Sequence, residues 1–461
     1  MQHGPMRIRL SALLLLISAL LAGNSLAARH ANILVIFADN MGYGDLGCYG
    51  CPDIKTPVID KLATEGVRFT NYYSNGPECT PTRTGFFTGR YPQRIRGLEC
   101  ALGSGNVGRY DHAFELADRK ELGMPPEKNT LVRLLKKAGY TAVGLGKWHL
   151  GYEQKFLPPE HGFDYFLAAL GGTVDYWYHN EPNGTPVLYE NSKRVTREGN
   201  LTDLITAGAL KFLRERDKDQ PFFLYLPYTA PSAPLQHPLI KHDKPKVSSA
   251  WDTKDWQAGS RRDYGRLVER LDYSVGKVLA EVDRLGLREN TLVIFASDNG
   301  GNDRARNAPF RGYTSDLFDG GIHIPCMARW PGVLPEGIVS GRQFLTLDLT
   351  VSILNAAGIK QPAGEDALDG IDILGAVASG EAPASRALFW RARRADRTWR
   401  AVRDGDLKFL TFRDSKGVDE YLFDLKDDPS EETNLFANRE SDVIRLRTQL
   451  VDWEKRMEAD W

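Results

Sequence analysis

The sequence predicts an α/β protein, because short runs of β-branched and aromatic residues alternate with amphipathic stretches along most of the chain. After about residue 385 the pattern changes to several short strands at close spacing, followed by a charged helix. A chain of 461 residues can bury a large core and still hold a smaller second unit. We therefore expect a main domain over residues 31–384 and a small C-terminal α+β subdomain over residues 385–461.

The main part is predicted to alternate strands with helices. The strands are rich in β-branched and aromatic residues, and they span Asn32–Ala38, Val67–Tyr73, Thr141–Leu145, Phe222–Tyr228 and Thr291–Ser297. The helices carry apolar residues at helical spacing, and they span Val58–Thr64, Leu131–Ala138, Leu204–Arg214, Tyr264–Leu285 and Leu347–Ala357. A long polar and aromatic stretch over residues 171–200 is expected to form loops above a site.

The C-terminal part is predicted to be a small antiparallel sheet with a terminal helix. Asp404-Gly405 supplies a turn signal between two of its strands. The four strands span Leu388–Arg391, Arg400–Arg403, Lys408–Phe412 and Tyr421–Asp424, and the helix spans Ile444–Met457.

The N-terminus has the pattern of an export signal. Arg7 and Arg9 precede the apolar run Leu10–Ala22, and Ser25-Leu26-Ala27 offers small residues for cleavage. The run is short for a membrane span, and no later stretch approaches that length. We therefore expect a signal peptide over residues 1–27, a secreted or periplasmic protein, and no stable membrane span.

Charge and cysteine content narrow the class further. The 59 Lys and Arg nearly balance the 60 Asp and Glu, which argues against nucleic acid as a partner. An exported protein can form disulfides, but spacing does not show how Cys48, Cys51, Cys100 and Cys326 would pair.

Two strands are followed directly by oxygen ligands. Asp39-Asn40 comes after the first strand, and Asp298-Asn299 comes after the strand that ends at Ser297. Ligands of open α/β sheets bind beyond the carboxyl ends of the strands, so both pairs are expected to face one crevice. Carboxylate and amide oxygens suit Ca²⁺, with Mg²⁺ as the alternative. Either pair alone would also fit turn chemistry.

Two further motifs complete a candidate site. Cys79-Thr80-Pro81-Thr82-Arg83 forms a Cys-x-Pro-x-Arg pattern, and the strand Thr141–Leu145 leads into Lys147 and His149. Lysine can hold an anionic oxygen, and histidine can move protons near neutral pH. The position after a third strand favours the same crevice.

With these motifs in this order, the chain resembles the type I, formylglycine-dependent sulfatases of the alkaline-phosphatase-like superfamily. Among them it is most similar to arylsulfatases and N-acetylgalactosamine sulfatases. The resemblance runs from about residue 31 to the end and implies a large mixed central sheet flanked by helices. The segments that carry it are residues 38–47, Cys79–Arg83, Gly146–Gly151, Asp298-Asn299-Gly300, Ala328–Gly332, Tyr421–Asp424, Asp428-Pro429 and Glu432–Leu435.

The resemblance also implies roles for these residues. Cys79 would be oxidised to formylglycine by a sulfatase-maturing enzyme, and the hydrated aldehyde would coordinate the cation and attack sulfur. Arg83 would stabilise this nucleophile, and Lys147 would neutralise a sulfate oxygen. His149 would remove the proton that allows sulfate to leave. The implied metal ligands are Asp39, Asn40, Asp298, Asn299 and the residue formed from Cys79.

Three positions depart from the family pattern. Asn40 stands where a second aspartate is usual, so we expect somewhat weaker metal binding. Ser232 and Thr314 stand where the family has a histidine and a lysine that contact the leaving oxygen. A sugar alkoxide needs a proton donor when it leaves. We expect His179 to supply it, with His237, His242 and His323 as alternatives.

The preferred function is hydrolysis of a sulfate ester on a carbohydrate, with aryl sulfates as further substrates. One alternative keeps the fold and nucleophile but acts on a phosphodiester or phosphonate monoester. Another is a catalytically silent protein that binds sulfated glycan. The intact set of Cys79, Arg83, Lys147 and His149 argues against this last alternative.

Overall fold

The structure of the protein is a computed structural model that describes residues 30–127, 129–244, 256, 258–381 and 385–458. The export signal expected over residues 1–27 lies outside these residues. Within the described ranges, no helix is both long enough and apolar enough to cross a membrane.

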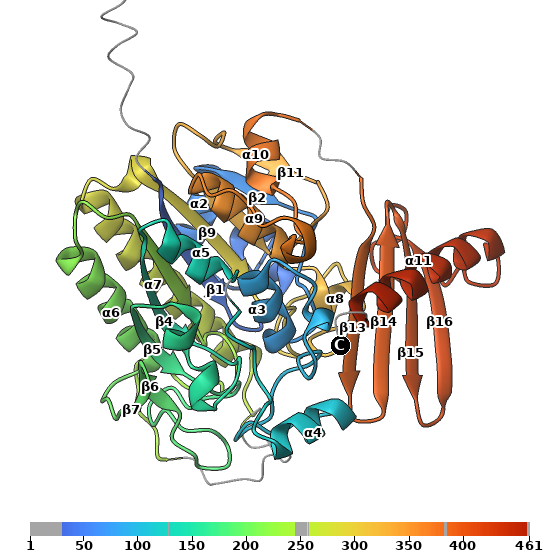
Figure 1. Ribbon diagram of the computed structural model, residues 1–461, viewed down its shortest axis with the longest axis horizontal. Helices are drawn as coiled ribbons and strands as arrows, with labels where there is room; N and C mark the ends of the chain where they lie inside the picture. Colours follow the sequence, from blue (N-terminus) through green and yellow to red (C-terminus); the bar gives the residue numbers. More distant parts are fainter. Residues whose placement is uncertain (1–29, 128, 245–255, 257, 382–384, 459–461) are drawn as a thin grey trace, which may run out of the picture.

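A ten-stranded mixed sheet forms the centre of the molecule, as the α/β class predicts, with the strand order β11-β2-β10-β9-β1-β8-β4-β5-β6-β7 (Figure 1). Its middle strands β9, β1, β8, β4 and β5 are parallel, whereas β10 and β6 pair antiparallel to their neighbours. In register, Val35 lies between Tyr225 and Ile294. The strands are β1 (Asn32–Ala38), β2 (Val67–Phe69), β4 (Thr141–Lys147), β5 (Tyr165–Ala169), β6 (Leu188–Glu190), β7 (Lys193–Arg194), β8 (Phe222–Pro227), β9 (Thr291–Ser297), β10 (Cys326–Arg329) and β11 (Ile338–Ser340).

Two groups of helices cover the sheet (Figure 1). In one group α7 packs on α2 and α6, and in the other α3, α5 and α9 pack together. Local signals begin the long helices, because Asn200 caps α6 and Ser260 forms a capping box with Asp263 at α7. The helices are α2 (Pro57–Thr64), α3 (Cys79–Thr88), α4 (Asp111–Asp118), α5 (Leu131–Lys137), α6 (Leu201–Glu215), α7 (Arg261–Arg284), α8 (Asp319–Ile322), α9 (Thr346–Ala356) and α10 (Ile373–Ala378).

Several elements of the main part were not predicted, among them strands β5, β6, β7, β10 and β11 and helices α4, α8 and α10. Two further differences are informative. The strand expected over Val67–Tyr73 is divided, because the chain bends at Thr70-Asn71 and β3 (Tyr72–Tyr73) pairs instead with β12 (Phe344–Leu345). Threonine and asparagine occur both in bends and at the ends of strands. The sequence of residues 67–73 therefore did not show that the strand is interrupted at Thr70-Asn71. Helix α3 was not predicted, because all ten of its residues are buried and such a helix shows no amphipathic period.

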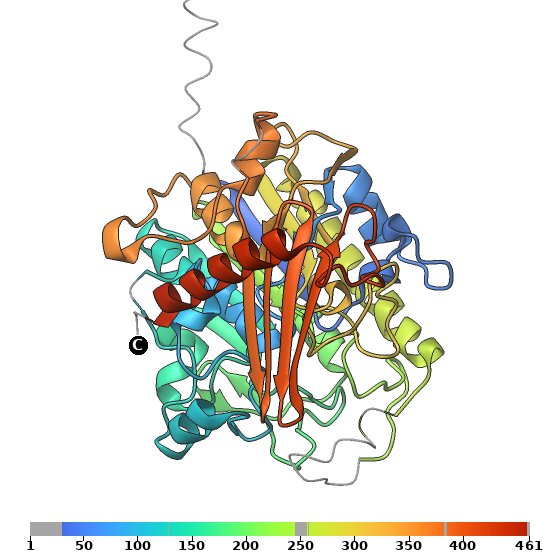
Figure 2. The same ribbon diagram turned by 90° about the vertical axis from the view of Figure 1, so that its right-hand side faces the viewer.

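The C-terminal part is a four-stranded antiparallel sheet with the order β13-β14-β15-β16, and helix α11 lies across its outer face (Figure 2). The strands extend further than predicted, and the elements are β13 (Leu388–Arg394), β14 (Arg397–Asp404), β15 (Leu407–Asp414), β16 (Gly417–Asp424) and α11 (Glu440–Glu458). The sheet shares an apolar cluster with Tyr73, Phe318 and Ile322 of the preceding chain. This shared core fixes the small sheet against the rest of the molecule.

A buried ion cluster joins the same two parts. The Lys408 Nζ atom lies 2.6 Å from Asp319 and 2.8 Å from Glu431, and all three side chains are buried. Asp319 also accepts a 2.7 Å hydrogen bond from the Tyr73 hydroxyl. Lys408 is thus the ammonium group that contacts both buried carboxylates.

We expect Lys408→Met to lower the free energy of unfolding by about 3–5 kcal/mol, because it leaves two buried carboxylates without a cation. Chemical denaturation monitored by tryptophan fluorescence measures the change. The matched control Lys416→Met removes an exposed lysine from the turn between β15 and β16 and should have little effect. Equal stability of both variants would contradict this role for Lys408.

Candidate active site

The candidate residues meet at the carboxyl edge of the parallel strands. Asp39 and Asn40 directly follow β1, Asp298 and Asn299 directly follow β9, and Lys147 is the last residue of β4. Cys79 is the first residue of α3. Parallel neighbours end at one edge of a sheet, so four separate segments contribute to one site.

Cys79 lies between a lysine and a carboxylate. Lys147 Nζ is 3.0 Å from Cys79 Sγ and 2.8 Å from Asp39 Oδ2. The thiol in turn donates to Asp39 Oδ1 at 3.3 Å. Burial, Asp298 and Asp39 raise the pKa of the Cys79 thiol well above its ordinary value. The unmodified side chain is therefore a neutral thiol in this setting, unlike the thiolate of a cysteine nucleophile.

Arg83 holds the second carboxylate in place. Its Nε and Nη2 atoms donate to Asp298 Oδ2 at 3.2 and 2.8 Å, and its Nη1 atom donates to the Lys147 carbonyl at 2.9 Å. Both charged side chains are fully buried. Because Arg83 is four residues after Cys79, it lies one turn further along α3 on the same side of the helix.

The oxygen atoms around Cys79 fit a hard cation. Atoms of Asp39, Cys79 and Asp298 that could bind a metal all lie within 4.8 Å of one another. Asn299 Oδ1 is buried and accepts no hydrogen bond from the described residues. Burial raises the pKa of Asp39 to about 6, with Lys147 opposing and Asp298 adding to the shift. Two carboxylates and an unpaired amide oxygen are a ligand set suited to Ca²⁺ or Mg²⁺.

His149 is placed as a neutral base. Its Nε2 atom lies 2.9 Å from the Leu102 carbonyl, which fixes the proton on that nitrogen. Nδ1 is buried and has no hydrogen-bond partner among the described residues. Burial, followed by the charge of Lys147, holds the pKa of His149 well below its ordinary value. The backbone of His149 has a φ of 57°, an unfavourable conformation of the kind often found at active sites.

The three departures from the family pattern lie in one hydrogen-bonded chain. Asn40 Nδ2 donates to Ser232 Oγ at 2.9 Å, and Asn299 Nδ2 donates to Asn40 Oδ1 at 2.6 Å. Asn299 Nδ2 also lies 3.2 Å from Thr314 Oγ1. Ser232 and Thr314 are therefore neutral partners of the two asparagines.

The candidate histidines lie outside this chain of contacts. His179 is buried in the loop over residues 171–200, and its Nε2 atom lies 3.1 Å from the Gly199 carbonyl. His237 Nδ1 accepts from the backbone of Leu239, and His242 lies 3.9 Å from Asp175. His323 contacts Asp319 and the Thr70 carbonyl with its two ring nitrogens, so it belongs to the buried ion cluster. Donation to the leaving group by His179 or His237 stays a prediction.

Arg109 is a site residue that sequence reasoning missed. Its Nε atom is buried without a hydrogen-bond partner among the described residues. Burial raises the pKa of the Glu78 carboxyl, but the charges of Arg394 and Arg109 lower it, so that it lies below its ordinary value. Arg109 is therefore close to Glu78. No motif surrounds Arg109, because it comes from a loop between α3 and α4.

A cleft of about 510 Å³ opens beside the site. Asn40, Ser232 and Thr314 line this cleft, and so do residues of the β13–β14 hairpin. All five cysteines of the chain are free thiols, and Cys100 also lines this cleft. The cleft therefore connects the three departure positions with the C-terminal sheet.

The fold and this site together define a hydrolase of anionic esters. Residues 31–359 match the family model described as Sulfatase, and residues 315–456 match N-sulphoglucosamine sulphohydrolase, C-terminal. The chain thus belongs to the sulfatase family and is a sulfuric ester hydrolase. This favours a sulfate ester over the phosphonate alternative.

Similar proteins span most of the chain. The N-acetylgalactosamine-6-sulfatase of Canis lupus familiaris is 34% identical over 390 residues, which cover 80% of this chain and 70% of the relative. The steryl-sulfatase of Mus musculus is 31% identical over 430 residues, with coverage of 76% and 65%. Among solved structures, Ps i-CgsB in complex with k-i-k-neocarrahexaose has a TM-score of 0.78 and 28% identity, over 92% of this chain and 93% of that chain.

We expect Asn299→Ala to reduce the rise in melting temperature that Ca²⁺ produces over metal-free buffer. A cation that binds only the folded state stabilises it by about 2.7 kcal/mol at 100 times its Kd. Loss of the unpaired Oδ1 ligand should weaken binding by at least about tenfold.

Differential scanning fluorimetry across a Ca²⁺ series, repeated with Mg²⁺, gives both affinities. Asn302→Ala is the matched control, because the Asn302 Oδ1 atom accepts a local hydrogen bond from the Arg304 backbone. A Ca²⁺ response in Asn299→Ala equal to that of the unaltered protein would show that Asn299 is not a ligand.

Proposed function

We propose that the protein hydrolyses a sulfate ester on a carbohydrate, with the residue derived from Cys79 as the nucleophile. The observation that carries this proposal is the position of Cys79, within hydrogen-bonding distance of both Lys147 and Asp39 at a cluster suited to a divalent cation. Oxidation of Cys79 to formylglycine by a maturing enzyme would supply an aldehyde hydrate, a stronger nucleophile than the buried neutral thiol.

The surrounding residues would divide the work of binding and proton transfer. Lys147 would hold a negatively charged sulfate oxygen, since its ammonium group already points at the Cys79 side chain. Arg83 would hold the Asp298 carboxylate in place toward the cation. His149 Nδ1, the unpaired nitrogen, would accept the proton that is released when sulfate leaves.

A divalent cation, which we propose to be Ca²⁺, would bind Asp39, Asn40, Asp298 and Asn299 and polarise sulfate oxygens. The amide of Asn40 supplies an oxygen without a charge, so metal binding is expected to be weaker than with aspartate. Ser232 is the hydrogen-bond partner that an amide at position 40 can use, since the Asn40 Nδ2 atom donates to its hydroxyl.

A carbohydrate substrate is proposed because of the names of the relatives and the character of the cleft. The relatives include N-acetylgalactosamine-6-sulfatases, and a similar structure holds a carrageenan hexaose. The cleft beside the site is lined by polar and aromatic side chains, which suits a sugar. We also propose that the protein is exported, in line with the signal expected over residues 1–27.

The Cys79 assignment is tested by mass analysis of the tryptic peptide after co-expression with a formylglycine-generating enzyme. We expect an aldehyde at position 79, sulfate release from aryl sulfate and sulfated sugars, and loss of at least about 1,000-fold activity in Cys79→Ser. Cys51→Ser is the matched control, because Cys51 is a free thiol near Asp53, and it should retain activity. Full activity with an unmodified thiol would refute the proposed nucleophile.

The base assignment predicts the acidic limb of the pH profile. A base acts in its deprotonated form, which predominates above its pKa. Since burial and Lys147 keep the pKa of His149 well below 6.5, activity should persist at lower pH than for an ordinary histidine. We expect the acidic midpoint of kcat below pH 6.5 and a loss of about 100-fold or more in His149→Gln.

Steady-state kinetics across pH provides the measurement. His30→Gln is the control, because His30 is the first described residue of the chain and its ring contacts the Ala357 carbonyl. An acidic limb that is unchanged in shape and height in His149→Gln would assign the base to another residue.

A further inference from the structure

The cleft beside the active site is lined by a hairpin that carries two facing arginines. Arg394 on β13 pairs directly with Arg397 on β14, with a tight turn at Ala395-Asp396 between them. Residues directly opposite on antiparallel strands project to the same face, and like charges there are unfavourable. Both arginines line the cleft.

The counter-ions of this pair are incomplete. Arg394 contacts Glu78 Oε1, but the same carboxylate also accepts hydrogen bonds from the Ala101 backbone and the Ser315 hydroxyl. Arg397 is exposed and, among the described residues, forms no ion pair at contact distance. The nearby negative charge is Asp396 in the turn, whose pKa is lowered by Ser415 and, to a smaller extent, by Arg397. Arg109 is partly buried, its Nε atom has no hydrogen-bond partner among the described residues, and it adds a third positive charge near Arg394. Three arginines thus stand against Glu78 and Asp396, so the local charge around the hairpin is positive.

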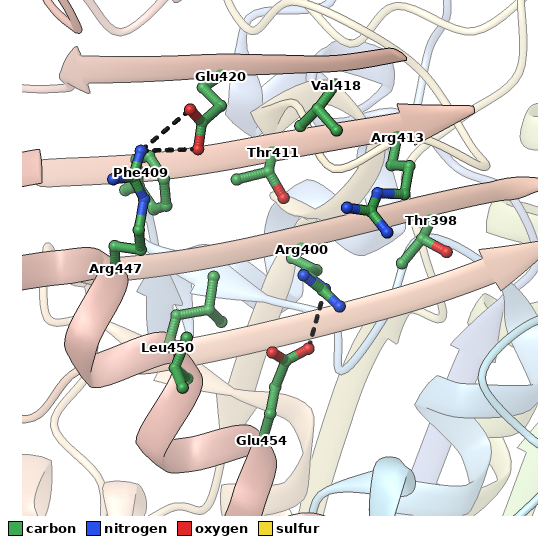
Figure 3. A pocket seen from close by; sticks show the side chains of 11 residues that line it. Thr398, Arg400, Phe409, Thr411, Arg413, Val418, Glu420, Arg447, Leu450 and Glu454 are labelled. Atoms are coloured by element: carbon green, nitrogen blue, oxygen red, sulfur yellow. Dashed lines mark hydrogen bonds and ion pairs between the residues drawn. The ribbon is translucent and has the colours of Figure 1, made fainter. Parts of the chain in front are cut away.

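A second arginine pair on the same hairpin shows how the chain neutralises such a contact when no ligand is involved. Arg391 also lies directly opposite Arg400. Arg400 pairs with Glu454 of α11 at 3.1 Å (Figure 3). Arg391 pairs with Glu458 of α11 at 2.7 Å and with Glu99, which precedes α4, at 2.8 Å. The pair that faces α11 has a glutamate for each arginine, whereas the pair that faces the cleft does not.

An aromatic surface accompanies the arginines. Trp399 is two residues from Arg397 on β14, so it projects to the same face and also lines the cleft. Its ring packs on Phe412 at 4.2 Å and meets Phe318 at 5.7 Å, which leaves the half-buried indole at the cleft wall. Indole rings beside cationic groups suit a sugar that carries an anionic substituent.

We propose that Arg394 and Arg397 bind a second anionic group of the substrate, a sulfate or a carboxylate on a sugar next to the one that is desulfated. The inference rests on the proposed function, since one cleft is lined both by Asn40, Ser232 and Thr314 and by the hairpin. Each planar guanidinium can hold two oxygens of such a group, and the anion would relieve the repulsion between the arginines. The substrate is thus a glycan with at least two negative charges.

Competition against aryl sulfate hydrolysis tests this subsite. The probes are N-acetylgalactosamine 6-sulfate, a chondroitin 6-sulfate disaccharide that adds a carboxylate, and a carrageenan tetrasaccharide that carries two sulfates. In the unaltered enzyme at least one doubly charged probe should inhibit about tenfold more strongly than the singly charged sugar. Comparison of the two doubly charged probes identifies the group that is preferred.

Arg397→Gln and Arg394→Gln should each reduce that advantage to near one. Arg413→Gln is the matched control, because Arg413 lies on the face of the same sheet that is turned to α11, beside Thr398 and Arg400 (Figure 3), and it should keep the advantage. Absence of any advantage in the unaltered enzyme, or an advantage that persists in both hairpin variants, would overturn the proposal.

Failure of the proposed function gives a different result. An unaltered protein that releases no sulfate from any substrate would refute the sulfatase assignment. Calorimetric titration of the three probes into the same protein would then still test the anion subsite. Tighter binding of a doubly charged probe that is lost in Arg397→Gln would support the subsite. Equal binding of all three probes would exclude it.

Discussion

Compensation of two buried carboxylates by two buried cations is the constraint on which the site depends. Asp39 and Asp298 stand at the ends of neighbouring parallel strands, where their charges would repel. Lys147 and Arg83 pair with them from β4 and α3. Removal of either cation would leave a buried charge, so the four elements have to meet in one arrangement. Cys79 is held in the middle of this arrangement.

The unusual residues of this chain are best understood together. An aspartate at position 40 would add a third negative charge to those of Asp39 and Asp298. A positively charged side chain at position 232 would balance that charge. Here both positions are neutral, and the Asn40 amide donates to the Ser232 hydroxyl. The same holds for Asn299 and Thr314, which lie at hydrogen-bonding distance. This part of the site is therefore polar but uncharged.

The C-terminal sheet contributes more than stability. Its apolar face and Lys408 fix it to the main sheet, and this attachment holds the β13–β14 hairpin at the cleft. Ser232 and Thr314 are neutral, whereas Arg394 and Arg397 bring positive charge to the same cleft. The chain thus carries this positive charge on the C-terminal sheet, where it could recognise a part of the substrate other than the ester that is cleaved.

The sequence by itself determined the α/β class, four of the five parallel middle strands and the residues at their carboxyl ends, because apolar periodicity and strand-end motifs are local. Lys147 and Asp298 could be assigned to one crevice since parallel strands end at a common edge, whereas Cys79 was placed there by its motif. Helix α3 and the break at Thr70-Asn71 escaped prediction, because complete burial removes periodicity and a change of pairing partner leaves no local trace. Only the tertiary structure could bring Arg109 beside the β13–β14 hairpin and the hairpin to the cleft, since these contacts join residues hundreds of positions apart.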